Sequence, residues 1–254
     1  MLKVLTLNIA HGVPSLPVPL PFLLPRHRLL EALEQMAAVL SRENADVVAL
    51  QEVDRAGLLS GKVDPLERLA ERAGYAYLFH GPHLHLGGFC NRGTALLSHR
   101  PLLETESWRF EGVWPVDKGY VLAAVDLGGG HVVDMVSAHL DFSSEPRRQQ
   151  QALRITEALQ RRPHRPRVVM GDMNSRQGNP GVGLERMMRT LALHTHEPGG
   201  GEPTYKAHAP QLRLDWILAS PELRFTHHRT LADRVSDHLA VEAVLELRAR
   251  RPAG

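Results

Sequence analysis

The sequence predicts an α/β protein in which two mixed β-sheets pack face to face and helices cover their outer sides. Aliphatic segments of strand length alternate with segments of helical periodicity along the 254 residues. Two stretches, 3–53 and 131–172, each have a strand–helix–strand pattern, which indicates an internal pseudo-repeat. Two sheets packed in this way would bury all the apolar faces. Since no linker or shift in composition divides the chain, we expect one domain over residues 1–254.

The first half of the chain is predicted to contain seven elements. They are strands over 3–9, 46–53, 75–80, 94–98 and 120–127, and helices over 26–44 and 64–73. Leu33, Met36 and Leu40 recur at helical spacing in the first helix. The second helix has Pro65 at its first position, and it ends at Gly74.

The second half is predicted to contain seven more elements. They are strands over 131–140, 167–172, 213–220, 223–228 and 239–247, and helices over 144–162 and 179–193. Three consecutive glycines, 128–130, predict a tight turn between the strand 120–127 and the strand 131–140. These two strands therefore form a predicted hairpin.

Composition and charge exclude several classes of protein. With 43% hydrophobic and 23% charged residues, the chain is neither disordered nor collagen-like. The only cysteine, Cys90, cannot form an internal disulfide, which favours a reducing compartment and excludes a disulfide-framed secreted scaffold. We see no signal peptide, and the most apolar window, 13–25, contains five prolines and is too short to span a membrane. A soluble, cytoplasmic and monomeric protein is expected, and a net charge of +2 does not indicate a dedicated nucleic-acid binder.

Polar clusters follow the predicted strands, as when a rigid scaffold presents functional groups at one rim of a sheet. The clusters are Asn8, Gln51-Glu52, His139-Leu140-Asp141, Gly171-Asp172-Met173-Asn174 and Ser236-Asp237-His238. Each cluster alone is also compatible with ordinary turns and caps. Asp215 is harder to explain structurally, because it lies within the apolar run 212–218 and a carboxylate in a strand core is costly unless it is paired. A nearby histidine would be a natural partner.

In this order, the clusters resemble the motifs of the endonuclease/exonuclease/phosphatase superfamily, which has the DNase I-like fold. The resemblance runs from Leu5 to Leu247 and rests mainly on Gly-Asp-Met-Asn after one strand and Ser-Asp-His before the last. It implies a four-layer α/β-β/α sandwich. It also implies a divalent-metal-dependent phosphohydrolase that uses Mg²⁺ or Mn²⁺ to cleave phosphate esters by attack of water.

The resemblance also implies a metal site. Glu52 is expected to be the main Mg²⁺ ligand, with Asn8 close by and Asp237 within reach of a metal. A hard divalent cation prefers oxygen ligands and neutralises the anionic oxygens that protect a phosphate ester from attack.

Catalytic roles follow from the same resemblance. Asp172 is expected to orient or deprotonate the attacking water, and Asn174 to hold that water or to bind the transition state. His238 is expected to contact the scissile phosphate, while Asp215 fixes its tautomer. His139 is expected to stabilise the transition state electrostatically.

Other polar residues precede strands that should end near this rim. Asn91, Arg92 and Lys118 are expected to contact the substrate phosphate, although exposed solvated charges explain them equally well. His11, His83 and His85 could line the mouth of the site, but they have no metal-ligand spacing and are more simply explained as ordinary loop histidines.

The substrate class stays open at this point. The segments 9–12 and 137–141 depart from the motifs of the exonuclease III-like AP endonucleases and are more similar to a broad bacterial branch that includes sphingomyelinase-like and DNase I-like members. A phosphodiesterase, with nuclease activity as one form of it, is the first hypothesis. A phospholipid headgroup hydrolase and a non-catalytic binding module on the same fold are the alternatives.

Overall fold

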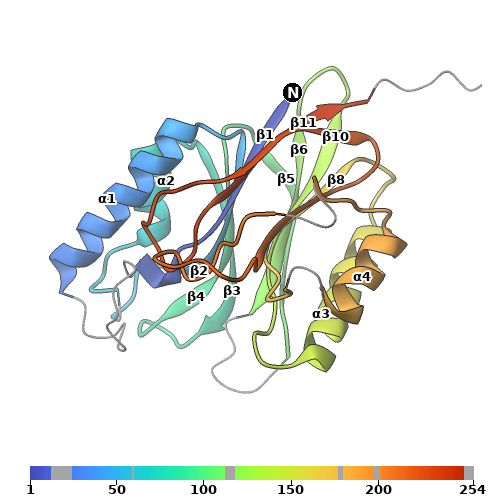
Figure 1. The fold of residues 1–254 in the computed structure, drawn as a ribbon. Helices are drawn as coiled ribbons and strands as arrows, with labels where there is room; N and C mark the ends of the chain where they lie inside the picture. Colours follow the sequence, from blue (N-terminus) through green and yellow to red (C-terminus); the bar gives the residue numbers. More distant parts are fainter. Residues whose placement is uncertain (13–24, 59, 112–117, 177–179, 197–200, 249–254) are drawn as a thin grey trace, which may run out of the picture.

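The computed structural model of the protein describes residues 1–12, 25–58, 60–111, 118–176, 180–196 and 201–248. Within these residues two β-sheets pack face to face, with α1 and α2 outside one sheet and α3 and α4 outside the other (Figure 1). The helices are α1 (Arg26–Glu43), α2 (Pro65–Ala73), α3 (Glu145–Gln160) and α4 (Gly181–Thr190), with a short 3₁₀ turn, η1, at Ala10–Gly12.

The described strands form one sheet of six and one of five. The first has the order β10 (Leu223–Thr230), β11 (Val241–Leu247), β1 (Leu2–Asn8), β2 (Val47–Asp54), β4 (Asn91–Ser98) and β3 (Tyr77–His85). The second has the order β5 (Leu102–Arg109), β6 (Gly119–Asp126), β7 (Val132–His139), β8 (Arg167–Asp172) and β9 (Asp215–Ala219). Only β1–β2 and β7–β8 are parallel among these pairs, so both sheets are mixed.

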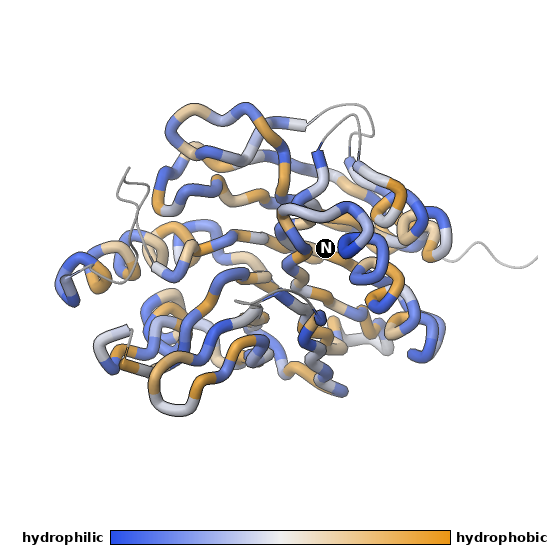
Figure 2. Tube along the Cα trace, turned by 90° about the horizontal axis from the view of Figure 1, so that it is seen from below, coloured by the Kyte–Doolittle hydropathy of each residue, from blue (hydrophilic) through white to orange (hydrophobic). Residues whose placement is uncertain are grey.

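Three apolar clusters separate the four layers. One lies between the sheets and contains Val4, Val121 and Ile217, while the other two lie between each sheet and its helices. Figure 2 shows hydrophobic and hydrophilic residues interleaved along the same elements. A central strand such as β7 is nevertheless buried along almost its whole length, because both of its faces are covered. The predicted α/β class with two packed mixed sheets and helices outside is confirmed.

Two details differ from the sequence-based expectation. The sequence analysis does not predict β5, which is an edge strand whose residues are mostly exposed and include Glu104, Glu106 and Arg109. Its pattern therefore lacks the apolar alternation that identifies a half-buried strand. In addition, β3 and β4 extend further toward their connection than predicted, through Gly81 and Pro82 at a register shift in the pairing.

The proline-rich stretch 13–25 lies outside the described residues except for Pro25, which precedes α1. The expected start of the last helix at 179 also lies outside them. Within the described residues, none of the helices has the length and hydrophobicity needed to cross a bilayer.

The strand register brings the predicted polar clusters to one end of the two sheets. In the parallel pairs, Asn8 lies opposite Gln51 and His139 lies opposite Asp172. Asp215 then lies opposite Asp172 in the antiparallel pair β8–β9. Parallel pairing aligns the strand ends within each sheet, and the packing of the two sheets then brings Asn8 and Asp172, 164 positions apart, to one rim.

Gly171 sets the spacing between β7 and β8 at this rim. Its φ is +139°, and a Cβ at this position would lie 1.9 Å from the carbonyl oxygen of Ala138. No side chain fits there without moving one of the two strands. A glycine is therefore required before Asp172, because the backbones of β7 and β8 approach each other closely at this point.

We expect Gly171→Ala to lower the free energy of unfolding by roughly 2 kcal/mol or more, since it adds overpacking to backbone strain. Gly130→Ala is the matched control, because Gly130 also has a positive φ (+79°) but a Cβ there meets nothing within 4 Å. The control should cost only about 1 kcal/mol. Urea denaturation followed by circular dichroism measures both, and equal losses would contradict the steric explanation.

Candidate active site

Glu52 is directed toward the rim by a bulge in β2. The register of β2 against β4 shifts between Leu50 and Val53, and Glu52 has a left-handed φ of 53°. Such a conformation is strained for a residue with a side chain, and strain of this kind tends to persist at functional sites. Gln51 and Glu52 thus lie in different surroundings, Gln51 buried and Glu52 lining a hollow at the rim.

Gln51 points into the interface between the two sheets. Its Nε2 donates to Ser137 Oγ of the other sheet (3.1 Å) and lies 3.2 Å from Thr6 Oγ1, while Ser137 Oγ donates to the Leu50 carbonyl (3.1 Å). All three side chains are buried. This small polar network therefore ties the sheets together directly behind Glu52.

Asp172 is the buried carboxylate to which the other residues converge. Asn8 Nδ2 donates to its Oδ2 (3.1 Å), and the backbone NH of Asn174 donates to its Oδ1 (3.0 Å). His139 Nε2 lies 3.3 Å and His238 Nε2 3.8 Å from Oδ2. Burial opposes ionisation, but His139 first, then His238 and Lys118, lower the pKa of Asp172 to about 2.

His238 is paired with Asp215 at the base of the site. His238 Nδ1 lies 2.8 Å from Asp215 Oδ2, and the Thr204 hydroxyl donates to the same oxygen (2.6 Å). Burial disfavours the imidazolium, but the carboxylate of Asp215, followed by that of Asp172, raises the pKa of His238 to about 10. Burial also raises the pKa of the Asp215 carboxyl, against the influence of His238. We therefore describe the pair as a carboxylate and an imidazolium at neutral pH.

Lys118 brings positive charge to the rim, beside the imidazole of His139. Lys118 Nζ lies 2.7 Å from His139 Nε2 and 3.5 Å from Glu52 Oε1. Burial opposes ionisation of Glu52, but Lys118 and then His11 and His139 hold the pKa of this carboxyl well below its usual range. Glu52 is consequently a carboxylate at every pH at which the protein would work.

A hollow opens above these groups. It is lined by Glu52, Lys118, His139, Phe142, Asp172, Asn174, Arg176, Tyr205, Leu212, Leu214, Asp237 and His238. Burial raises the pKa of Asp237; His238 opposes this shift, and the negative charges of Glu52 and Asp172 add to it. Carboxylates from three separate segments thus face one space and repel one another.

The donor set of this hollow fits a divalent cation. Glu52, Asp172 and Asp237 supply carboxylate oxygens, which are the ligands preferred by Mg²⁺ and Mn²⁺. A bound cation would also relieve the repulsion that raises the pKa of Asp237. Asp172, Asp215 and His238 offer ligand atoms within 4.8 Å of one another, so this cluster could also hold a metal ion. Within the described residues, Asp215 Oδ1 is buried without a hydrogen-bond partner.

The structure brings most of the predicted site residues together. Those that line the hollow or contact a residue lining it are Asn8, Glu52, Lys118, His139, Asp172, Asn174, Asp215, Asp237 and His238. Asn91 and Arg92 are placed differently. Neither lines the hollow: Arg92 Nε lies 3.0 Å from Asp54 Oδ1 at the end of β2, and Asn91 pairs with His85 at the beginning of β4.

Several residues of the site were not found by sequence reasoning. Thr204 holds Asp215, and Tyr205 packs its ring at 4.8 Å from that of His238. Phe142 and Arg176 line the hollow. Thr204 and Tyr205 lie in a loop segment without periodicity, so the sequence has no signal for them. Phe142 and Arg176 lie two or three positions beyond His139-Leu140 and Met173-Asn174, and this adjacency is the only available signal.

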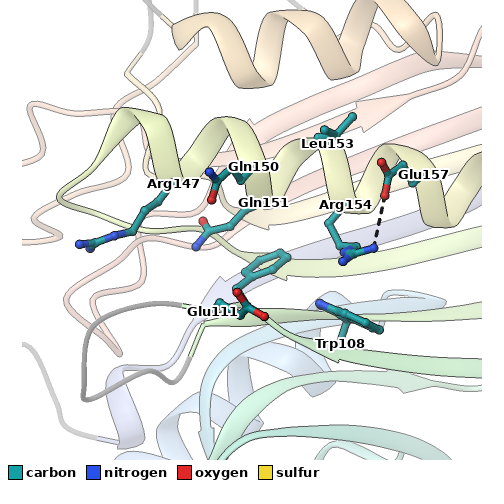
Figure 3. A pocket seen from close by; sticks show the side chains of 9 residues that line it. Trp108, Glu111, Arg147, Gln150, Gln151, Leu153, Arg154 and Glu157 are labelled. Atoms are coloured by element: carbon teal, nitrogen blue, oxygen red, sulfur yellow. Dashed lines mark hydrogen bonds and ion pairs between the residues drawn. The ribbon is translucent and has the colours of Figure 1, made fainter.

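A second hollow lies between α3 and the end of β5 and shares no lining residue with the first (Figure 3). Arg154 stacks over the Trp108 ring at 4.5 Å and pairs with Glu157 at 3.4 Å. Arg147 and Glu111 complete a balanced set of charges. None of the converging acid and imidazole groups reaches this hollow, so the rim is the better candidate for chemistry.

Comparisons with solved structures agree with the fold described above. An endonuclease/exonuclease/phosphatase from Beutenbergia cavernae has a TM-score of 0.75 and 23% identity, over 99% of this chain and 73% of that one. The human Nocturnin catalytic domain has a TM-score of 0.72 and 18% identity, over 97% and 94%. A mannosyl-6-phosphatase from Bacteroides thetaiotaomicron has a TM-score of 0.71 and 14% identity, over 97% and 100%.

No curated protein matches the chain in a sequence search. The sequence profile of the Endonuclease/Exonuclease/phosphatase family, in contrast, matches residues 5–238. This range includes Asn8, Glu52, His139, Asp172 and His238, which the structure gathers at the rim. The family hydrolyses phosphate esters with the help of divalent metal ions. The chain therefore belongs to the endonuclease/exonuclease/phosphatase family.

Proposed function

We propose that the protein is a Mg²⁺- or Mn²⁺-dependent phosphodiesterase whose active site is the hollow at the rim. One observation supports this most directly: a buried Asp–His pair and three further carboxylates converge on the same space, beside a lysine and a second histidine. This arrangement combines groups that bind a metal, a water and an anionic phosphate. A pure binding module has no need for a carboxylate buried in a strand beneath a histidine.

We assign Glu52 and Asp237 as metal ligands, with Asn8 close by. When bound there, a divalent cation supplies Lewis-acid chemistry that neutralises charge on the phosphoryl oxygens. Asn8 Oδ1 accepts from the Ala10 backbone NH (3.0 Å) while Asn8 Nδ2 donates to Asp172 (3.1 Å), so the Asn8 side chain is fixed beside Asp172.

We assign Asp172 and Asn174 to the attacking water. Asp172 is anchored by Asn8 and by the Asn174 NH, which leaves its carboxylate fixed at the bottom of the hollow. Asn174 has a left-handed φ of 47° and donates to the Leu140 carbonyl (2.9 Å), so its amide is also held in place. With a pKa of about 2, Asp172 is a weak base at neutral pH, and orienting the water is its main role.

We assign His238, His139 and Lys118 to the phosphate. Asp215 holds His238 as an imidazolium, which can donate a charge-assisted hydrogen bond from Nε2 to a phosphoryl oxygen. His139 and Lys118 approach from the opposite side of the hollow, where negative charge builds up in the transition state. Because these groups are already in place around the phosphate, few side chains would need to reorient during the reaction.

The substrate class is tested with a panel of compounds. Bis-p-nitrophenyl phosphate, p-nitrophenyl phosphate, plasmid DNA, RNA and sphingomyelin are each incubated with Mg²⁺, Mn²⁺ or EDTA. We expect turnover of the diester with either metal and none in EDTA. Turnover of the monoester alone would replace the diesterase proposal with a phosphatase, turnover of sphingomyelin alone would favour the lipid headgroup alternative, and no turnover at all would favour a binding module.

Glu52→Gln should lower kcat/KM for the diester by at least about 100-fold, because it removes a charged metal ligand while keeping the shape of the side chain. Glu246→Gln is the control, since Glu246 lies near the far end of β11 and pairs with Arg224. Both variants should retain the circular dichroism spectrum of the wild type. Full activity of Glu52→Gln, or of the wild type in EDTA, would contradict the metal assignment.

Asp215 and His238 should behave as one unit. Because the 2.8 Å pair acts through the imidazole, Asp215→Asn combined with His238→Ala should be little worse than His238→Ala alone. The measurement is kcat/KM on one diester for the wild type, both single variants and the double variant. Fully additive penalties would show that the two residues act independently.

The pH dependence should report the same pair. His238 is needed as the imidazolium, so activity falls as pH rises through its pKa of about 10. Asp215→Asn removes the favourable charge and leaves burial, so the pKa of His238 falls and the alkaline limb moves to lower pH by about 1 to 3 units. Asp134→Asn is the control, because Asp134 is equally buried but lies at the opposite end of β7. An alkaline limb that stays in place would refute the pairing.

A further inference from the structure

We propose that His11, Asp54 and Arg92 form a positioning chain that holds the Glu52 carboxylate in the orientation required for the divalent cation. This positioning chain begins at Arg92 and ends at Glu52. It assigns a role to His11, which the sequence leaves as a loop histidine, and to Arg92, which the structure does not place in the hollow. The inference rests on the proposed function, since it concerns the metal ligand of that site.

The contacts follow one another from Arg92 through Asp54 and His11 to Glu52. Arg92 Nε lies 3.0 Å from Asp54 Oδ1, and the same oxygen lies 3.1 Å from His11 Nδ1. His11 Nε2, the opposite ring nitrogen, lies 3.4 Å from Glu52 Oε2. The imidazole is thus fixed on one edge by Asp54 and presents its other edge to Glu52. Paired contacts of this kind on an imidazole determine which nitrogen carries a proton and how the ring is oriented.

The two oxygens of Glu52 are held from opposite sides. Oε2 faces His11, whereas Oε1 faces Lys118 at 3.5 Å and His139 at 3.8 Å. None of these distances is short enough to saturate the carboxylate, so its lone pairs remain available for a cation. Of the three neighbours, Lys118 and His139 line the hollow, and His11 alone approaches from outside it.

The backbone on both sides of this contact is strained. Ala10, His11 and Gly12 have consecutive left-handed φ values of 46°, 58° and 75°, and Glu52 has a φ of 53°. A run of such residues is uncommon, because the Cβ of an L-residue approaches the following carbonyl. Backbone strain that survives on both partners of one contact indicates that the geometry of the contact is selected.

Local hydrogen bonds keep the turn in this shape. Asn8 Oδ1 accepts from the Ala10 NH, and the Ile9 carbonyl accepts from the Gly12 NH (2.8 Å). Ile9 NH in turn donates to the Gln51 carbonyl (3.0 Å), which links the turn to the residue before Glu52. The segment that carries His11 and the bulge that carries Glu52 are therefore built as one unit.

The test measures cation affinity directly, independent of catalysis. Binding of Mn²⁺ to metal-free protein is followed by electron paramagnetic resonance for the wild type, His11→Ala, His11→Gln and Arg92→Gln. We expect His11→Ala to weaken Mn²⁺ binding by about 10- to 100-fold, the usual effect of removing a partner of a metal ligand. His11→Gln, which keeps a donor near the position of Nε2, should restore part of this loss.

His99→Ala is the matched control. His99 follows β4 at the end where Ser98 pairs with Val47, which is the opposite end of β2 from Glu52. Mn²⁺ affinity should be unchanged in this variant. In activity assays, His11→Ala should raise the Mg²⁺ concentration needed for half-maximal rate, whereas the rate at saturating Mg²⁺ should fall much less. If His11 had a purely structural role, His11→Ala would lower the melting temperature, but it would not raise the half-maximal Mg²⁺ concentration more than it lowers the rate at saturating Mg²⁺.

The outcomes distinguish the inference from the proposed function. If the wild type binds Mn²⁺ and folded His11→Ala and Arg92→Gln bind it equally well, the positioning chain is refuted and the metal site stands. If the wild type shows no saturable Mn²⁺ binding, the metal-dependent function fails and the inference falls with it. Should His11→Ala not fold, Arg92→Gln at the far end of the chain decides: wild-type affinity in that variant refutes the proposal.

Discussion

The arrangement of the rim depends on keeping one buried carboxylate, Asp172, ionised. A carboxylate without water is costly unless donors and cations replace its hydration. Here the replacements come from β1, from the end of β7, from the segment after β8 and from the segment before β11. Each of these segments must end at the same point in space for Asp172 to be tolerated. The requirement of one charge thereby fixes the positions of three distant segments of the chain relative to the end of β8.

The same rim alternates negative and positive groups at short distances. Glu52 and Asp237 share the hollow with the positive charges of Lys118 and His238 and with the imidazole of His139. Such a surface favours ligands that carry both signs of charge, for example a phosphate accompanied by a divalent ion, over either ion alone. Because the side chains are held by neighbours rather than by solvent, the electrostatic field exists before any ligand arrives.

Much of this organisation follows from the sequence, and the failures have physical causes. Aliphatic runs and polar residues at their ends locate the central strands and residues such as Asp172 and His238. The sequence does not predict the edge strand β5, because its residues are mostly exposed and charged and show no apolar alternation. The sequence also does not predict that Arg92 pairs with Asp54. The direction of the side chains in this part of β2 depends on the bulge at Glu52, and a bulge is a property of pairing between strands. Thr204 matters only through its contact with Asp215, which no local pattern encodes.

The position of β1 has a consequence for biosynthesis. β1 lies in the interior of its sheet, between β2 and β11, so among the described strands the first in sequence is flanked by the last (Figure 1). A nascent chain that lacks β11 exposes one edge of β1. It also lacks the strand that fixes the position of His238, which precedes β11. A chain that ends before β11 therefore has neither the complete six-stranded sheet nor the complete rim. Contacts of such long sequence separation slow folding, and the rim can be completed only after β11 has been synthesised.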